Sequence, residues 1–481
     1  MSTVAVAPQD AAQTTRRNRR PLYVAVGIAI LLAAWLAPPF AGLSPAAVKT
    51  LGVMATTVFW WVTEALPIPV SGLLVLPLLD LLGAAPFNKV AAQSFGDPFV
   101  PFMVGCLALS VAFTQSGLGK RITYMILRFA GTKVSTILNI FFWVSFVHFI
   151  TDVAQVALMY PIGLSLARQA GAKPGQSNFG TSLMFAITFG AVLGGLCTPS
   201  GAPSNIITIS FLEKNAGLTM TFLDWMLIST PIAVVIGFFT LWLIKRMYPS
   251  EMEHLPFSAD VIKQDLKSMG PWSREEKVTL AVFMVAVVLW LSGGATKLPI
   301  ASVSLLIIGL LTLPGISAFK SWKVVENNLE WGSLMLMIGG FAMGVAAFDS
   351  GLATWFAQHA AQPLAVLPLP AQPFAVTLLV ALDSLGFSSF TAAAAVNVPL
   401  FIAYAQQAGF PLQSLAMTAG LASSTHFILV TESLCFVLTY AAGYYTFRDL
   451  FKVGSIVTLV SALVISLGLL AAGMPNGTPL H

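Results

Sequence analysis

Long apolar stretches, separated by short breaks rich in proline, glycine and polar residues, recur along the whole chain. Four clear examples are residues 23–38, 230–244, 278–291 and 455–473. A helix needs about 20 mostly apolar residues to cross the hydrocarbon core of a bilayer. The pattern therefore predicts an all-α polytopic membrane protein with about ten to twelve crossings, several of them broken.

Composition agrees with this pattern and excludes an ordinary soluble protein. Of 481 residues, 57% are hydrophobic and only 9% are Asp, Glu, Lys or Arg. Soluble domains carry about 25% charged residues, which they need to cover a water-facing surface. The net charge of +5 does not indicate a nucleic-acid partner, because the basic residues lie at the ends of apolar stretches.

Those basic residues predict the orientation of the chain. Loops rich in Lys and Arg stay in the cytoplasm, so the N-terminus and the central loop are expected on the inner face of the inner (plasma) membrane. We expect the first apolar stretch to be a retained span, because no convincing cleavage site follows it. The residues concerned are Arg16, Arg17, Arg19, Arg20, Lys245, Arg246, Lys263, Lys267, Arg274 and Lys277.

The chain also repeats itself. Residues 103–118 and 337–352 are identical at eight of sixteen positions, and three further blocks recur in the same order. With one leading span and an odd number of spans per repeat, the halves would be inverted in the membrane, as in secondary transporters. The further pairs are 66–68 with 298–300, 151–171 with 389–409, and 221–224 with 446–449.

The repeat and the charges together predict the organisation of the chain. Each half is expected to carry broken helices, and a cytoplasmic loop joins the halves. The expected segments are a cytoplasmic tail at 1–20, a leading span at 21–44, a first inverted repeat at 45–246, a connecting loop at 247–277, a second inverted repeat at 278–473 and a tail at 474–481.

The breaks locate a candidate site. Residues 194–205 contain two prolines and three glycines and cannot form one helix, and Asp152 interrupts an apolar stretch nearby in the sequence. Residues 383–399 and 423–435 are the equivalents in the second half. Breaks at membrane depth are tolerated only where they line a cavity, where half-helix N-termini attract anions and free carbonyls attract cations.

Three motifs in these regions resemble the divalent anion:sodium symporter family. Residues 59–69 are similar to its Trp-Trp-x-Thr-Glu-Ala-x-Pro entry, and residues 198–205 to its Thr-Pro-x-Gly-Thr-Pro-Pro-Asn loop. Residues 443–449 resemble its closing Gly-Tyr-x-Thr segment, so the resemblance runs from about residue 45 to 470. It implies transport of dicarboxylates, citrate or sulfate by an elevator mechanism. It also implies a homodimer, each protomer with a scaffold domain and a moving domain with two re-entrant hairpins.

The departures from this family matter as much as the matches. The family places Ser-Asn-Thr at each hairpin tip, where the side chains hold substrate carboxylates and sodium. Here the tips align as Thr151-Asp152-Val153 and Ser389-Phe390-Thr391, and the second loop ends in Phe436 where the first has Asn205. Because phenylalanine supplies no sodium ligand, we expect one cation site around Asp152 in place of a symmetric pair.

The candidate site residues follow from these alignments. No arginine lies near them in the sequence, so an anion would be held by hydroxyl groups and helix N-termini. We expect substrate contacts from Thr151, Asp152, Thr198, Pro199, Ser389, Thr391 and Ser433. We expect cation contacts from Asp152, Gly201, Asn205 and Glu432, with Na⁺ at Asp152 and Asn205.

The predicted function is Na⁺-coupled secondary transport of a small organic anion, di- or tricarboxylate-like, without a further cofactor. Asp152 could instead take a proton or pair with a cationic group of the substrate, which leaves H⁺ symport open. Cation-independent anion exchange, and a monoanion, sulfonate or inorganic anion as substrate, remain alternatives. A channel or an intramembrane enzyme is the rival from another class, but the chain shows no catalytic or P-loop motif.

Overall fold

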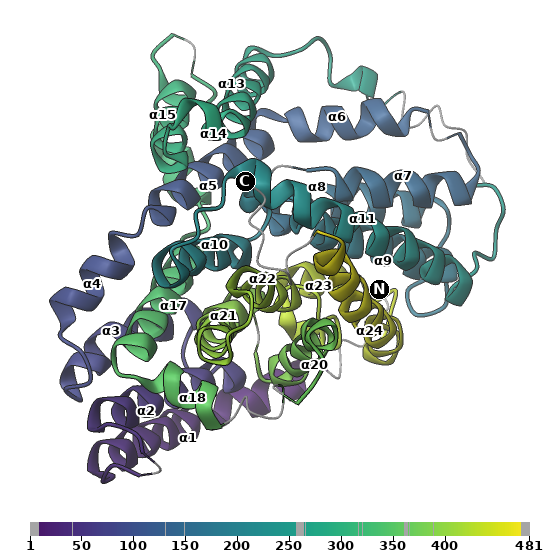
Figure 1. Cartoon of the computed structure of the whole chain (residues 1–481). Helices are drawn as coiled ribbons and strands as arrows, with labels where there is room; N and C mark the ends of the chain where they lie inside the picture. The colour runs from purple at the N-terminus through teal and green to yellow at the C-terminus, as the bar shows by residue number, and fades with distance from the viewer. Residues whose placement is uncertain are drawn as a thin grey trace.

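The structure is a computed structural model (Figure 1). It describes residues 9–472 except 41, 130, 149, 256–263, 265, 316, 320, 360–363, 365 and 388, and the side chains of 9–18 and 369 are also left out. The side chains of Arg16 and Arg17, residue Lys263 and the expected tail at 474–481 therefore lie outside the described part. Within it, the regular elements are helices, with one isolated bridge between Lys133 and His254.

The first half of the chain contains eleven α-helices and one short 3₁₀ helix among the described residues. They are α1 (Gln9–Leu36), α2 (Pro45–Thr63), α3 (Ile68–Leu81), α4 (Phe87–Phe95), α5 (Phe99–Ser116), α6 (Leu118–Leu127), α7 (Val134–Phe146), α8 (Asp152–Gln169), α9 (Asn178–Gly195), η1 (Pro199–Gly201), α10 (Pro203–Ala216) and α11 (Phe222–Met247).

The second half follows with a closely similar series. Its described elements are α13 (Arg274–Leu291), α14 (Gly293–Thr296), α15 (Ile300–Thr312), α16 (Trp322–Asn328), α17 (Trp331–Asp349), α18 (Leu352–His359), η2 (Leu369–Ala371), α20 (Gln372–Asp383), η3 (Ser384–Gly386), α21 (Phe390–Ala408), α22 (Leu412–Ala422), η4 (Val430–Glu432), α23 (Leu434–Tyr440) and α24 (Phe447–Ala471).

The helices have the lengths that a membrane requires. In the described part of the chain, seven helices are long and apolar enough to cross a bilayer, namely α1, α2, α5, α9, α11, α17 and α24. Five shorter apolar segments accompany them, and these include the two short helices α7 and α20 that precede the expected tips. The expected all-α polytopic class is confirmed, whereas the number of crossings and the re-entrant nature of the α7–α8 and α20–α21 hairpins stay predictions.

The long helices α11 and α24 begin with the same cap. The carboxylate of Asp224 accepts a hydrogen bond from the backbone N–H of Thr221 at 2.9 Å, and Thr221 Oγ1 caps the helix in return. Asp449 and Thr446 repeat this arrangement at 2.8 Å. Such reciprocal caps satisfy N–H groups that the first turn cannot pair, so these two acids have a structural role.

Each half packs one long helix against a shorter helix of the other half. Helix α5 packs on α15, and its counterpart α17 packs on α3, the counterpart of α15. A Cβ atom added at Gly105 would lie 2.4 Å from the Cβ of Ser304, and one at Gly339 would lie 2.3 Å from the carbonyl oxygen of Gly72. Both contacts therefore need a glycine, and their sequence offsets match those of the repeat. The inversion of the halves across the membrane stays a prediction.

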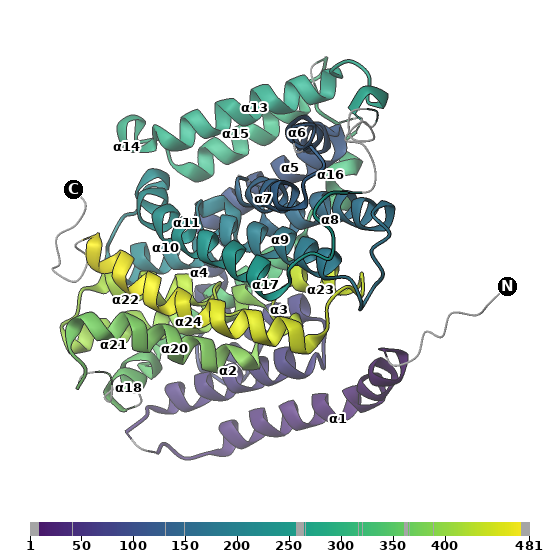
Figure 2. The same cartoon turned by 90° about the vertical axis from the view of Figure 1, so that its right-hand side faces the viewer.

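This arrangement places the helix breaks in the interior. Figure 1 shows α22 and α23 in the middle of the molecule, with α8, α9 and α11 on one side and α20 and α21 on the other. Figure 2 shows α1 and α2 at one edge and α13 and α15 at the opposite edge. The breaks that follow α9 and α22 therefore meet between the two groups of helices.

Candidate functional site

A cavity of about 380 Å³ lies where the tips and breaks of the two halves meet. Six of the residues expected from the sequence line it: Thr151, Asp152, Ser389, Thr391, Glu432 and Ser433. The other four candidates are buried but do not line the cavity: Thr198, Pro199 and Gly201 lie in the loop before α10, and Asn205 lies in the first turn of that helix. From that segment the lining includes Ala202, Pro203 and Ser204.

Several helices begin at this cavity. Its lining includes first-turn residues of α3, α8, α10, α17 and α21, for example Val153 of α8 and Ser204 of α10. The first-turn N–H groups of a helix have no partner within the helix and carry a partial positive charge. With Leu434 at the start of α23, six such ends surround the cavity, and they favour a negatively charged occupant or balance acidic side chains in the wall.

The first turn of α10 presents an unpaired oxygen. Asn205 Nδ2 donates hydrogen bonds to the carbonyl oxygens of Gly195 and Thr198, both at 2.8 Å. These two bonds fix the amide, and its Oδ1 atom is buried without a hydrogen-bond partner. A buried acceptor left unpaired is costly unless another group or a cation satisfies it.

Asp152 and Gly201 complete this corner. A Cβ atom added at Gly195 would lie 3.2 Å from the Cβ of Asp152, so the end of α9 touches the start of α8. A Cβ at Gly201 would lie 2.3 Å from the carbonyl oxygen of Gly195, so only glycine fits there. Asp152 Oδ1 accepts a bond from the N–H of Val153 at 2.8 Å, within a polar corner suited to a hard cation.

The equivalent loop of the second half has the same backbone and different chemistry. Ala202 (φ −149°, ψ 142°) and Ser433 (φ −148°, ψ 142°) occupy matching positions after η1 and η4. Phe436 replaces Asn205, and its ring lies 5.4 Å from that of Phe189 between ring centroids. An aromatic contact thus fills the place where an amide ligand would stand.

Glu432 occupies the position that corresponds to Gly201. Its Oε2 atom accepts a hydrogen bond from the N–H of Ile428 at 2.9 Å. Its Oε1 atom is buried and has no hydrogen-bond partner. Glu432 therefore brings a second carboxylate with spare bonding capacity into the cavity wall.

Glu330 and Ser333, which were not expected from the sequence, line the same cavity from the start of α17. Ser333 Oγ donates to Glu330 Oε1 at 2.8 Å. The only sequence signal was the position of Glu330 before the repeated block of α17, which resembles an ordinary helix cap. With Asp152 and Glu432, the wall holds three carboxylates, and none of its described lining residues is Lys, Arg or His.

Comparisons with known proteins place this architecture among transporters. The family model described as the sodium:sulfate symporter transmembrane region matches residues 19–475. The sodium-dependent dicarboxylate transporter SdcS of Staphylococcus saprophyticus is 28% identical over 446 residues, covering 87% of this chain and 85% of the relative. SdcS of Staphylococcus aureus strain USA300 is 26% identical over 445 residues, with the same coverage.

Two solved structures share the fold at low sequence identity. The YdaH transporter of Alcanivorax borkumensis gives a TM-score of 0.52 at 15% identity, covering 82% of this chain and 89% of that one. MtrF of Neisseria gonorrhoeae gives 0.54 at 12% identity, covering 93% and 94%. The family model, which matches most of the chain, confirms the resemblance drawn from the sequence motifs at the level of the family, and the two solved structures show a shared fold.

Proposed function

Because the chain belongs to the sodium:sulfate symporter family, whose members are membrane transporters, we propose that it couples uptake of a small organic anion to Na⁺. The anion is di- or tricarboxylate-like, as the names of the SdcS relatives suggest. The observation that carries the proposal is the buried, unpaired Oδ1 of Asn205 in the corner formed with Asp152. An amide oxygen and a carboxylate are ligands that hard cations prefer.

In this proposal Na⁺ binds between Asn205 and Asp152, next to Gly201. Asn205 supplies Oδ1, which is held in place by the two hydrogen bonds that Nδ2 donates to carbonyl oxygens. Asp152 supplies a carboxylate oxygen and the compensating charge. The second half offers no matching amide, since Phe436 stands at that position, so one Na⁺ site of this kind is expected.

The substrate occupies the cavity itself. Thr151, Ser389, Thr391 and Ser433 offer hydroxyl groups from both halves, and the helix ends favour its negative charge. Bound Na⁺ offsets the charge of Asp152. Thr198 and Pro199 act indirectly, by shaping the loop that holds Asn205. Glu432, expected from the sequence as a further cation contact, keeps an unpaired Oε1, which makes H⁺ a candidate coupling ion as well.

The reciprocal packing of α5 on α15 and α17 on α3 supports an inverted repeat, with segment boundaries as predicted from the sequence. Two halves related in this way can present one central site to either side of a membrane. We propose that transport follows an elevator mechanism in a homodimer. The protein would reside in the inner (plasma) membrane with its N-terminus in the cytoplasm, as the basic residues at the span ends indicate.

The test is uptake of radiolabelled anions into vesicles that contain the purified protein. Succinate, citrate and sulfate are offered under an inward Na⁺ gradient, under a proton gradient, and without a gradient but with internal substrate. The proposal predicts accumulation against the substrate gradient with Na⁺ alone. Accumulation driven only by protons, or only by internal substrate, would replace Na⁺ coupling with H⁺ symport or exchange. Flux that runs only downhill would identify a channel.

A further inference from the structure

A second cavity, of about 550 Å³, shares no lining residue with the first. It lies between α6, α7, α8 and α13, and most of its wall is apolar. Ile122 and Ile126 come from α6, Trp143 and Val144 from α7, and Leu280 and Phe283 from α13.

The few polar side chains in its wall already have partners within the protein. Gln155 Nε2 donates to the carbonyl oxygen of Val144 at 2.9 Å, and Thr123 Oγ1 donates to that of Gly119 at 2.9 Å. The ring nitrogens of His148 lie 2.8 and 2.9 Å from two carbonyl oxygens. Asn139 Oδ1 accepts a hydrogen bond from Lys245. The polar side chains of the wall are thus few and each already makes a contact within the protein, and the rest of the wall is apolar, which favours an apolar chain as the occupant.

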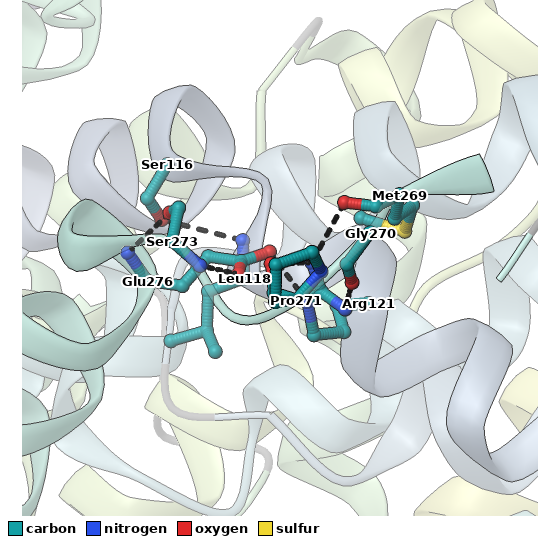
Figure 3. Close-up of polar contacts among 8 residues, drawn as sticks. All are labelled: Ser116, Leu118, Arg121, Met269, Gly270, Pro271, Ser273 and Glu276. Atoms are coloured by element: carbon teal, nitrogen blue, oxygen red, sulfur yellow. Dashed lines mark hydrogen bonds and ion pairs between the residues drawn. The ribbon is translucent and has the colours of Figure 1, made fainter. Parts of the chain in front are cut away.

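Helix α6 is fixed over this cavity by a buried arginine (Figure 3). Arg121 Nε donates to Glu276 Oε1 at 2.7 Å. Its other nitrogens donate to the carbonyl oxygens of Met269, Gly270 and Pro271 at 2.9–3.2 Å. Glu276 is held in turn by the N–H of Ser273 at 2.8 Å, at the start of α13. These charged hydrogen bonds join α6 to the beginning of α13. They hold the two helices at a fixed separation on either side of the cavity.

The C-terminal end of α6 carries positive charge beside a second hollow. Arg128, Phe129, Leu266 and Lys267 line that hollow, and Arg128 follows Ile126 of the cavity wall by two residues. Arg128 and Lys267 are exposed, and Phe129 is 72% exposed. Exposed cations next to exposed apolar side chains are typical of a segment at the membrane surface, where anionic headgroups gather.

We propose that this cavity binds an acyl chain of an anionic phospholipid, whose headgroup contacts Arg128 and Lys267. The apolar wall accepts the chain, and the two cations select the charge of the headgroup. The bound acyl chain fills the space between α6 and α13, two helices that the contacts of Arg121 hold together. The proposal does not depend on which substrate or ion the protein transports.

Native mass spectrometry of the full chain, released from nanodiscs that contain equal phosphatidylglycerol and phosphatidylcholine with identical acyl chains, tests the proposal. The wild type should retain phosphatidylglycerol in preference. The double change Arg128→Gln and Lys267→Gln should reduce that preference about fivefold for each charge removed. The matched control Arg168→Gln with Lys173→Gln, outside both hollows, should leave it unchanged. Equal retention of both lipids by the wild type, or an equal loss in the control, would overturn the assignment.

The cavity itself is tested by Ile122→Trp, which fills it and should release both lipids from a folded protein. Lipid retention at the wild-type level in that variant would contradict the proposal. If the variant fails to fold, the wild type is labelled with a phosphatidylglycerol that carries a diazirine on its acyl chain. Crosslinks should fall at residues 122–126, 143–147 or 280–283, and labelling confined to other segments would refute acyl binding here.

Discussion

The loops before α10 and before α23 share one backbone and differ in what their side chains can hold. Ala202 and Ser433 agree within one degree in φ and ψ, yet one loop continues to Asn205 and the other to Phe436. In the first, Gly195 lies against Asp152, and Gly201 lies against Gly195. In the second, His426 and Glu432 stand at those positions, and the ring of His426 packs on Phe390 at 4.9 Å.

This difference teaches that a duplicated fold can keep its shape while its two sites diverge. The backbone of each loop is determined by its place between two helices, which both halves preserve. The ligands depend on single side chains, which each half can change separately. One half thus holds a polar corner suited to a cation, and the other holds an aromatic cluster that contributes packing.

The change with the largest expected effect is Asp152→Asn, which removes the charge from the polar corner. We expect Na⁺-driven uptake into vesicles to fall about 100-fold or more, because loss of a buried charged partner costs about 3 kcal/mol. Asp383→Asn removes a carboxylate from the other hairpin, outside the cavity lining, and should leave uptake near wild type. If Asp152→Asn keeps the ion dependence of the wild type, the single site around Asp152 is wrong.

In the second half, Phe436→Ala should lower the stability of the protein. The Phe436 ring is fully buried against Phe189 and Phe427, so its removal should cost about 3–5 kcal/mol of unfolding free energy. The measurement is thermal unfolding of the purified protein in detergent, with and without Na⁺. The stabilisation by Na⁺ should persist, and its disappearance would show that the second loop also binds the ion.

Asn205→Ala tests the proposed cation site in the first half. Removal of one buried amide ligand should raise the Na⁺ concentration for half-maximal uptake about tenfold or more, since a bond to a charged group contributes about 1.5–3 kcal/mol. The Na⁺ dependence of initial uptake rates provides the measurement. An unchanged Na⁺ dependence in a folded variant would place the ion elsewhere.

Glu432→Gln asks whether the second carboxylate also takes part in coupling. With the site centred on Asp152, we expect the half-saturating Na⁺ concentration to change less than about fivefold, or 1 kcal/mol. Uptake under Na⁺ and under proton gradients is compared between this variant and the wild type. Loss of Na⁺ coupling as severe as in Asp152→Asn would make Glu432 an equal partner.

The smallest effect is expected where the two loops touch. Ser204 Oγ and Ser424 Oγ lie 2.6 Å apart, joining the start of α10 to the end of α22. Ser424→Ala should lower the unfolding free energy by about 1 kcal/mol and leave the Na⁺ dependence unchanged. Thermal unfolding detects the first change, and an altered Na⁺ dependence would indicate that the contact also shapes the cation corner.

The sequence by itself determined the class, the family and the location of the breaks. These features can be predicted locally, because every span must be apolar over its own length and every break needs proline, glycine or polar residues. Asp152 and Ser389 were found because the repeat aligned the two tips, and Ser433 because the second loop aligned with the first.

Only the tertiary structure decided which of these residues face the cavity and which stand behind it. Thr198 and Asn205 belong to the same motif as Ser204, yet Ser204 alone of the three lines the space. Glu330 joins Asp152 from 178 residues away, through the packing of α17 and α3. Contacts between distant segments depend on how whole helices pack, and the pattern along one segment carries no record of its neighbours.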